Sequence, residues 1–178
     1  MSSFINVQMV FDTQTLLSKY PNPSQDSGNP TGINHTDVFM ITQSVFLADP
    51  KTQGTADLNI KADEDDIIRW RGTSLSDNVS QSAIPYKIQR FSGTQVTDIP
   101  VPTEAHPWIH VPNQDPNTKV VDPLHYTPTK LPDYYMQCTV TDSGTEGYQV
   151  WFYIAQEASG GTVKTLGYFY WDPTITVT

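Results

Sequence analysis

Apolar and polar residues alternate one by one in several short segments of this sequence. The clearest segment is residues 56–62 (ADLNIKA), and residues 134–141 (YYMQCTVT) repeat the pattern. Successive side chains of a β-strand point to opposite faces, so this alternation predicts strands that bury one face in a core. A chain built from such segments must pair them into sheets.

The composition favours the same fold class. The 178 residues include 14 Pro and 10 Gly, which interrupt helices, and nine Tyr, seven Phe and four Trp, which favour strands. Length and composition together predict a single all-β domain over residues 1–178.

The order of the segments predicts an antiparallel β-sandwich of about eight to ten strands. One short helix is expected at Thr13–Lys19, with Asp12 as its cap. Residues 97–132 are rich in proline and predict a long surface loop with at most short strands. Residues 147–156 are apolar on both faces from Val150 to Ile154, which predicts a central strand covered on both sides with Trp151 buried.

The charge balance excludes several partners. With 19 Asp and Glu against 10 Lys and Arg the net charge is −9, and no stretch gathers basic residues, so nucleic acid is not an expected partner. No segment approaches the roughly 20 apolar residues of a membrane helix, so we expect no membrane insertion. The first residues (MSSFINVQMVFD) lack a secretory signal, which predicts a cytoplasmic protein and leaves non-classical release open.

Four consecutive acids, residues 63–66, lie between two predicted strands. Consecutive side chains in a turn diverge and cannot converge on one ion, and the alternate spacing of a calcium loop is absent. The pattern therefore favours a solvated charged turn and no cofactor. The alternative is a weak calcium site in which Asp63 or Asp65 acts with Asp57.

Histidine and cysteine offer little support for catalysis. His106 and His110 are spaced i, i+4, but Pro107 and Pro112 argue against the helix that would place both on one face. Cys138 lies on the apolar side of its predicted strand, so we expect a core residue and not a nucleophile. The common nucleophile, phosphate-binding and zinc-protease motifs are absent, so the chain is predicted not to be an enzyme.

Tryptophan is the remaining indicator of a binding site. Trp70, Trp151 and Trp171 stand in predicted strands among apolar or alternating residues, which favours packing in the fold. Trp108 stands in the proline-rich segment and is predicted to be exposed.

Three segments carry a family resemblance: INVQMVFDTQTLLSKYPNPSQDSGNPTGINH, DLNIKADEDDIIRWRGTSLSDN and GYFYWDPTITV. They occur in this order across nearly the whole chain, which resembles the bacterial inclusion body protein family that includes AidA and PixA. The resemblance implies a non-enzymatic bacterial protein, made in quantity, associated with intracellular inclusions and with an animal or plant host. PixA-type members are methionine-rich, whereas this chain has four Met, so the AidA side is the closer likeness.

Two functional hypotheses follow. The first is a self-associating, host-associated protein that forms a homo-oligomer, with a two-fold dimer expected as the commonest assembly. The second is a lectin-like module that binds carbohydrate. Whether calcium assists this binding is left open. The second hypothesis places these residues in the binding site: Trp108, His106, His110, Asp77 and Asn78.

Overall fold

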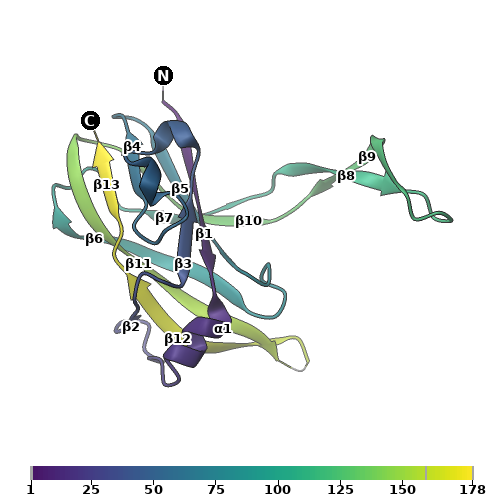
Figure 1. The fold of residues 1–178 in the computed structure, drawn as a ribbon, viewed down its shortest axis with the longest axis horizontal. Helices are drawn as coiled ribbons and strands as arrows, with labels where there is room; N and C mark the ends of the chain where they lie inside the picture. Colours follow the sequence, from purple (N-terminus) through teal and green to yellow (C-terminus); the bar gives the residue numbers. More distant parts are fainter. Residues whose placement is uncertain (1, 159, 178) are drawn as a thin grey trace. The chain divides into compact units, whose positions relative to one another are not determined.

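A computed structural model describes residues 2–158 and 160–177, and strands dominate it (Figure 1). The strands are β1 (Phe4–Phe11), β2 (Thr31–Gly32), β3 (Val38–Ile41), β4 (Asn59–Ala62), β5 (Ile67–Ser74), β6 (Ser82–Gly93), β7 (Val101–Ala105), β8 (Trp108–Gln114), β9 (Val121–Lys130), β10 (Asp133–Thr139), β11 (Gly144–Ala158), β12 (Thr162–Trp171) and β13 (Thr174–Val177). The helical segments are α1 (Thr13–Lys19) and two 3₁₀ turns, Ser44–Phe46 and Pro50–Thr52. The predicted all-β sandwich class is confirmed, with more strands than the eight to ten expected.

The chain divides into two compact units, each described by itself. Unit 1 comprises residues 1–102 and 135–178, and unit 2 comprises Thr103–Tyr134. The single domain over residues 1–178 stays a prediction. Within the described residues, no helix is long and apolar enough to cross a membrane.

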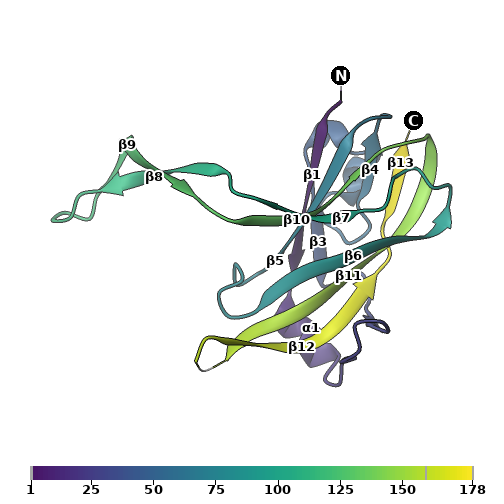
Figure 2. The ribbon, with the colours of Figure 1, turned by 180° about the vertical axis from the view of Figure 1, so that it is seen from behind.

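Two sheets make up most of unit 1, and their strands β7 and β10 continue past residues 102 and 135. One has the strand order β3-β1-β5-β10-β7, and the other has the order β2-β12-β11-β13-β4 with β6 also paired to β11. Seen from behind, β6, β11 and β12 lie side by side (Figure 2). Most pairs are antiparallel as predicted, but β1 and β5, β12 and β2, and β13 and β4 pair in parallel. Alternation predicts strands, but it does not encode which distant strand each one will meet.

The core lies between the two sheets and is rich in aromatic rings. Phe11 of β1 packs against Phe152 of β11 with ring centroids 4.3 Å apart, and both contact the buried Trp171. Across the same interface, the indole N–H of Trp70 donates to the hydroxyl of Tyr148 over 3.2 Å. Burial of these rings stabilises the fold, and aromatic pairs also prefer particular orientations. These contacts therefore help to fix how the two sheets stack.

Two other expectations are confirmed. Helix α1 spans Thr13–Lys19 as predicted, and the carboxylate of Asp12 accepts a hydrogen bond from the Thr15 N–H. Cys138 is a buried core residue, and burial raises the pKa of its thiol, which opposes a nucleophilic role.

Strand β11 corrects the prediction that Trp151 is buried. Tyr148, Val150, Phe152 and Ile154 point into the core, whereas Trp151 lies partly exposed on the opposite face of the sheet. The strand is central, with β6, β12 and β13 as neighbours, but the core covers only one of its faces. Aromatic residues on the outer face made the sequence look apolar on both sides.

Unit 2 also differs from the predicted long loop. Strands β8 and β9 pair in antiparallel register from Trp108↔Lys130 to Gln114↔Val121 and form a two-stranded hairpin. Prolines did not prevent pairing. Both strands of the hairpin are edge strands, and an edge strand tolerates residues such as Pro112 and Pro128 that lack a backbone N–H group. We call residues 103–134 the hairpin unit.

Candidate binding surfaces

One side of the hairpin unit gathers aromatic residues and prolines. Trp108 and His110 are two positions apart on β8 and therefore share a face, and their cross-strand partners are Lys130 and Pro128. The Lys130 ammonium lies 5.0 Å from the Trp108 ring centroid, and the His110 ring lies 4.4 Å from that of Tyr126. Trp108 is 61% exposed, which confirms the prediction for this residue.

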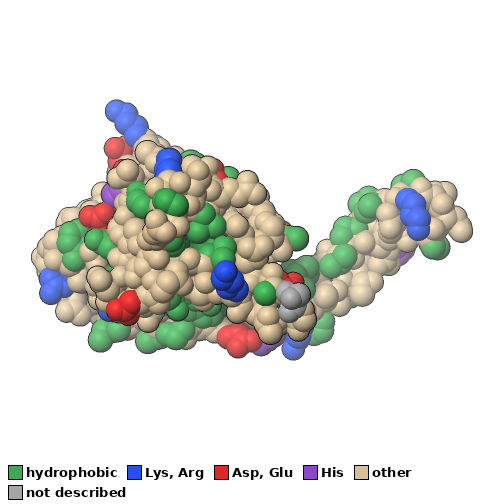
Figure 3. All heavy atoms as spheres, turned by 90° about the horizontal axis from the view of Figure 1, so that it is seen from below, with side chains coloured by type: hydrophobic (Ala, Val, Ile, Leu, Met, Phe, Trp, Pro, Cys, Tyr) green, Lys and Arg blue, Asp and Glu red, His purple; other side chains and the backbone are tan. Residues whose placement is uncertain are grey.

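The hairpin unit leaves its large apolar side chains in solvent, and hydrophobic groups are visible along it in Figure 3. The exposed residues are Trp108, Ile109, Val111, Val120, Val121, Leu124, Tyr126, Leu131 and Tyr134. A two-stranded hairpin alone is at best marginally stable in water. Exposed apolar side chains in such number are a feature of interaction sites in general, so the hairpin unit is a candidate binding surface.

The other residues of the carbohydrate hypothesis have local partners. His106 lies 3.2 Å from a carboxylate oxygen of Glu104 within the hairpin unit. Asp77 and Asn78 lie in unit 1, in the turn between β5 and β6, and both have left-handed backbones (φ 53° and 59°). The Asn78 side-chain oxygen accepts hydrogen bonds from the backbone N–H groups of Ser74 and Ala83, so this amide holds the turn together.

The four acids form a turn in which one member is buried. Asp66 is 4% exposed, and its carboxylate accepts hydrogen bonds from the N–H groups of Ser3 (2.7 Å) and Asp63 (3.0 Å). The side chains of Asp63 and Asp65 are exposed, in agreement with a charged turn. Across residues 2–158 and 160–177, no three His, Cys, Asp or Glu side chains form a group that could hold a metal ion. Calcium binding at Asp57 with Asp63 or Asp65 stays a prediction.

Asp57 instead contacts a histidine. Nδ1 of His35 contacts the Asp57 carboxylate, and Nε2 lies 2.9 Å from Oδ1 of Asp172. Because the two carboxylates lie on opposite sides of the ring, the three groups cannot share one ion. Burial lowers the pKa of His35, but the hydrogen bonds and charges of both carboxylates outweigh burial and raise this pKa above 6.5. The His35 ring therefore ties together three loops of unit 1, and both carboxylates favour its protonated form.

The outer face of the β6-β11-β12 sheet carries a cluster of partly exposed aromatic residues that sequence reasoning missed. We call it the aromatic face, and its members are Tyr86, Trp151, Tyr153, Tyr168 and Tyr170. Tyr86 lies at its centre, with ring centroids 5.7 Å from Tyr168 and 6.1 Å from Tyr153. The Lys87 ammonium lies 4.0 Å from the Trp151 ring centroid. The available signal was the spacing of two between Trp151 and Tyr153 and between Tyr168 and Tyr170.

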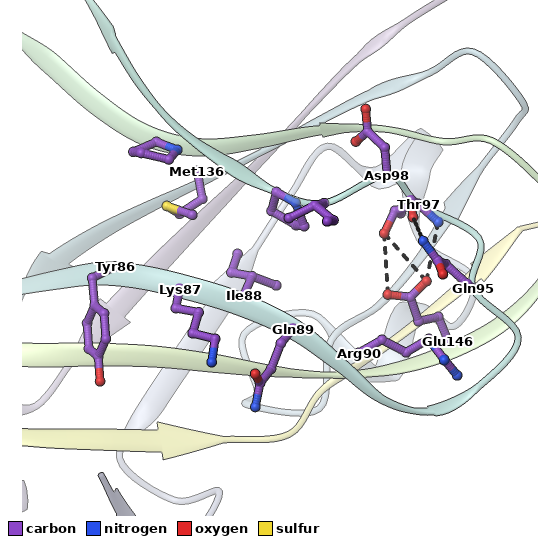
Figure 4. A pocket seen from close by; sticks show the side chains of 13 residues that line it. Tyr86, Lys87, Ile88, Gln89, Arg90, Gln95, Thr97, Asp98, Met136 and Glu146 are labelled. Atoms are coloured by element: carbon purple, nitrogen blue, oxygen red, sulfur yellow. Dashed lines mark hydrogen bonds between the residues drawn. The ribbon is translucent and has the colours of Figure 1, made fainter. Parts of the chain in front are cut away.

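A pocket of about 390 Å³ lies on the other side of β6 within unit 1 (Figure 4). Ile88 points toward Met136, whereas Tyr86, Lys87 and Gln89 point away to the opposite side of the strand. The polar wall includes Glu146, which is buried and accepts hydrogen bonds from the N–H groups of Val96 (2.7 Å) and Thr97 (3.3 Å). This carboxylate holds the segment after β6 in place.

Comparisons with known proteins agree with one another. The model of a family of inclusion body proteins, PixA, matches residues 3–177. Among solved structures, the chain is similar to an inclusion body protein of the PixA family from Burkholderia cenocepacia J2315, with 22% sequence identity and a TM-score of 0.75. The alignment covers 100% of this chain and 97% of that protein. A search of the curated proteins finds no match.

Proposed function

Because this chain belongs to the PixA family of inclusion body proteins, we propose that it is a non-enzymatic protein that self-associates through its hairpin unit. The observation that carries this proposal is the exposure of nearly every apolar side chain of that unit. The hairpin has no core of its own, so burial against a partner would supply the apolar contacts that it lacks.

A second copy is the partner that we propose. A protein that accumulates in inclusions meets its own copies at a far higher concentration than any other protein. Each apolar side chain that leaves water contributes on the order of 25 cal/mol per Å². Several such side chains on one hairpin can therefore overcome the repulsion between copies of net charge −9.

The absence of catalysis is part of the same proposal. The Cys138 thiol is buried with a raised pKa, and His35 is held between two carboxylates. Neither group is positioned as a nucleophile or base over a cleft. This supports a structural role for both.

Analytical ultracentrifugation tests self-association. We expect wild-type protein to form a small discrete oligomer, and we expect Leu124→Ser with Tyr126→Ser in the hairpin unit to raise the dissociation constant at least about tenfold. The matched control is Val45→Ser with Val79→Ser in unit 1, where the same kind of exposed side chain (74% and 82%) is removed. A wild-type monomer at all concentrations, or an equal effect of the control, would contradict the proposal.

Location and host association form the finer part of the proposal. We propose accumulation in the bacterial cytoplasm as inclusions and a role in host association, both resting on family membership. Fractionation of producing cells, and host colonisation by a strain that lacks the protein, are the corresponding measurements.

A carbohydrate-binding role is the second candidate, and the exposed Trp108 favours it. An indole 61% open to solvent can stack on a sugar ring, and His110 lies on the same side of the hairpin. A glycan array with and without calcium tests this role. Selective binding that is lost in Trp108→Ala would favour it, and no binding to any glycan would exclude it.

A further inference from the structure

We propose that the hairpin unit of one copy packs against the aromatic face of a second copy. This inference rests on the proposed self-association through the hairpin unit and adds the surface that receives it. Both surfaces occur once in each chain.

The receiving surface has the composition of an interface. Tyr and Trp are enriched where proteins meet, because they bury a large area with few rotatable bonds and keep a polar group for the rim. The aromatic face presents five such rings on three adjacent strands, all partly exposed. The fold uses only part of their area, since the core lies on the other side of the sheet.

The hairpin unit offers a surface of matching chemistry. Extended proline-containing segments dock on surfaces lined by aromatic side chains, because their rigid backbone loses little entropy on binding. The hairpin unit contains six prolines, of which Pro112, Pro123 and Pro128 lie in its extended strands. Pro112 and Pro128 lie on the same face as Trp108 and His110.

Edge-to-edge pairing of two hairpin units is the main competing arrangement, and proline opposes it. Pro112 in β8 and both Pro123 and Pro128 in β9 lack the N–H group that a new neighbouring strand would need. Contact through the faces of the hairpin unit does not require these hydrogen bonds. The prolines therefore favour a partner surface made of side chains.

Charge supports the same pairing. The hairpin unit holds four carboxylates and two lysines, a net −2, and the remaining 15 acidic and 8 basic residues give −7. An acidic hairpin is repelled by most of a neighbouring copy. At the aromatic face it would meet Lys87, which lies over Trp151, although the charge of Asp26 also acts on Tyr86 there.

A complementation experiment with two full-length variants tests the inference. The hairpin variant is Leu124→Ser with Tyr126→Ser, and the face variant is Lys87→Glu with Tyr153→Ser. We expect each variant alone to associate at least about tenfold more weakly than wild type, and an equimolar mixture to recover a complex, because one intact hairpin then meets one intact face. Thermal unfolding of each variant checks that its fold persists.

The outcomes separate this inference from the proposed function. If the hairpin variant is weakened but the mixture recovers nothing, the aromatic face is not the receiving surface, although self-association through the hairpin stands. If wild-type protein never associates, the proposed function itself fails.

Photo-crosslinking provides a second test that does not depend on weakened variants. Leu124, which is 83% exposed, is replaced by p-benzoylphenylalanine, and labelled and unlabelled copies are mixed before irradiation. We expect crosslinks between copies to β6, β11 or β12, and no such crosslinks from the same probe at Val79. Crosslinks to the other copy's hairpin unit, or only within one copy, would overturn the inference.

Discussion

Several buried or half-buried polar residues of unit 1 hold loops in place. His35 bridges Asp57 and Asp172, Asp66 accepts two backbone hydrogen bonds, and Glu146 does the same after β6. Backbone N–H groups that are removed from water need such partners. These charged residues therefore contribute to stability, and their substitution should be read first as a change in folding free energy.

The His35 bridge predicts a pH-dependent stability. The pKa of His35 is raised in the folded protein, so its contribution is fully present below about pH 6.5 and is lost as pH rises through the folded value. Urea unfolding should therefore show His35→Gln to be more destabilising near pH 6 than near pH 8.5. In a background with Asp57→Asn and Asp172→Asn this pH dependence should vanish, and its persistence would contradict the bridge.

The acid turn predicts unequal effects of neighbouring carboxylates. Asp66→Asn removes a buried charged acceptor of two N–H groups, so the free energy of unfolding should fall by about 1.5–3 kcal/mol. Asp63→Asn with Asp65→Asn, at exposed positions, should change it by less than about 1 kcal/mol. Asn also tolerates the left-handed backbone of Asp65 (φ 70°). Chemical denaturation measures the free energy of unfolding of both variants. Equal decreases would contradict the inference that the buried Asp66 carboxylate matters more than the exposed ones.

At the scale of elements, two tryptophans allow a direct comparison of positions. Trp70 lies on the core face of β5, and Trp151 lies on the outer face of β11. Trp70 is fully buried, so Trp70→Ala should cost about 3–5 kcal/mol by leaving a cavity. Trp151 lies on the aromatic face, so Trp151→Ala should cost about 1–2 kcal/mol. Denaturant unfolding monitored by circular dichroism distinguishes them, and a larger loss for Trp151→Ala would restore the original prediction of a buried residue.

Local patterns predicted the individual strands well. Alternation located β4 and β10, and the Asp12 cap located α1. The pattern failed at β11, where outward aromatic residues and inward apolar residues look alike in the sequence. It also failed in residues 97–132, because proline composition does not reveal that two open-edged strands can pair with each other.

The candidate binding surfaces were only partly predictable for a related reason. Trp108 stood out because it lies in a polar, proline-rich segment next to Pro107 and between His106 and His110, and it is indeed exposed. The aromatic face depends on β6, β11 and β12 lying side by side, and Tyr86 is far in sequence from Tyr153 and Tyr168. The same applies to His35, whose partners are 22 and 137 residues away.

For the whole molecule, charge predicts how association depends on solution conditions. With a net charge of −9 at pH 7 and a pI near 4.6, copies repel at neutral pH, and salt screens this repulsion over roughly 8 Å at physiological ionic strength. We expect a soluble small oligomer in dilute neutral buffer and larger assemblies as pH approaches 5 or salt rises. Light scattering against pH and salt measures this, and monomer under all conditions would contradict it.

The prolines of the hairpin unit have a consequence for the material state of an inclusion. Amyloid grows when strands of successive molecules stack through continuous backbone hydrogen bonds, and each proline interrupts such a stack. Pro112, Pro123 and Pro128 place these interruptions in both strands of the most exposed segment. A deposit of this protein should therefore consist of folded molecules held by side-chain contacts, so that it binds no thioflavin T and releases native protein on dilution at neutral pH.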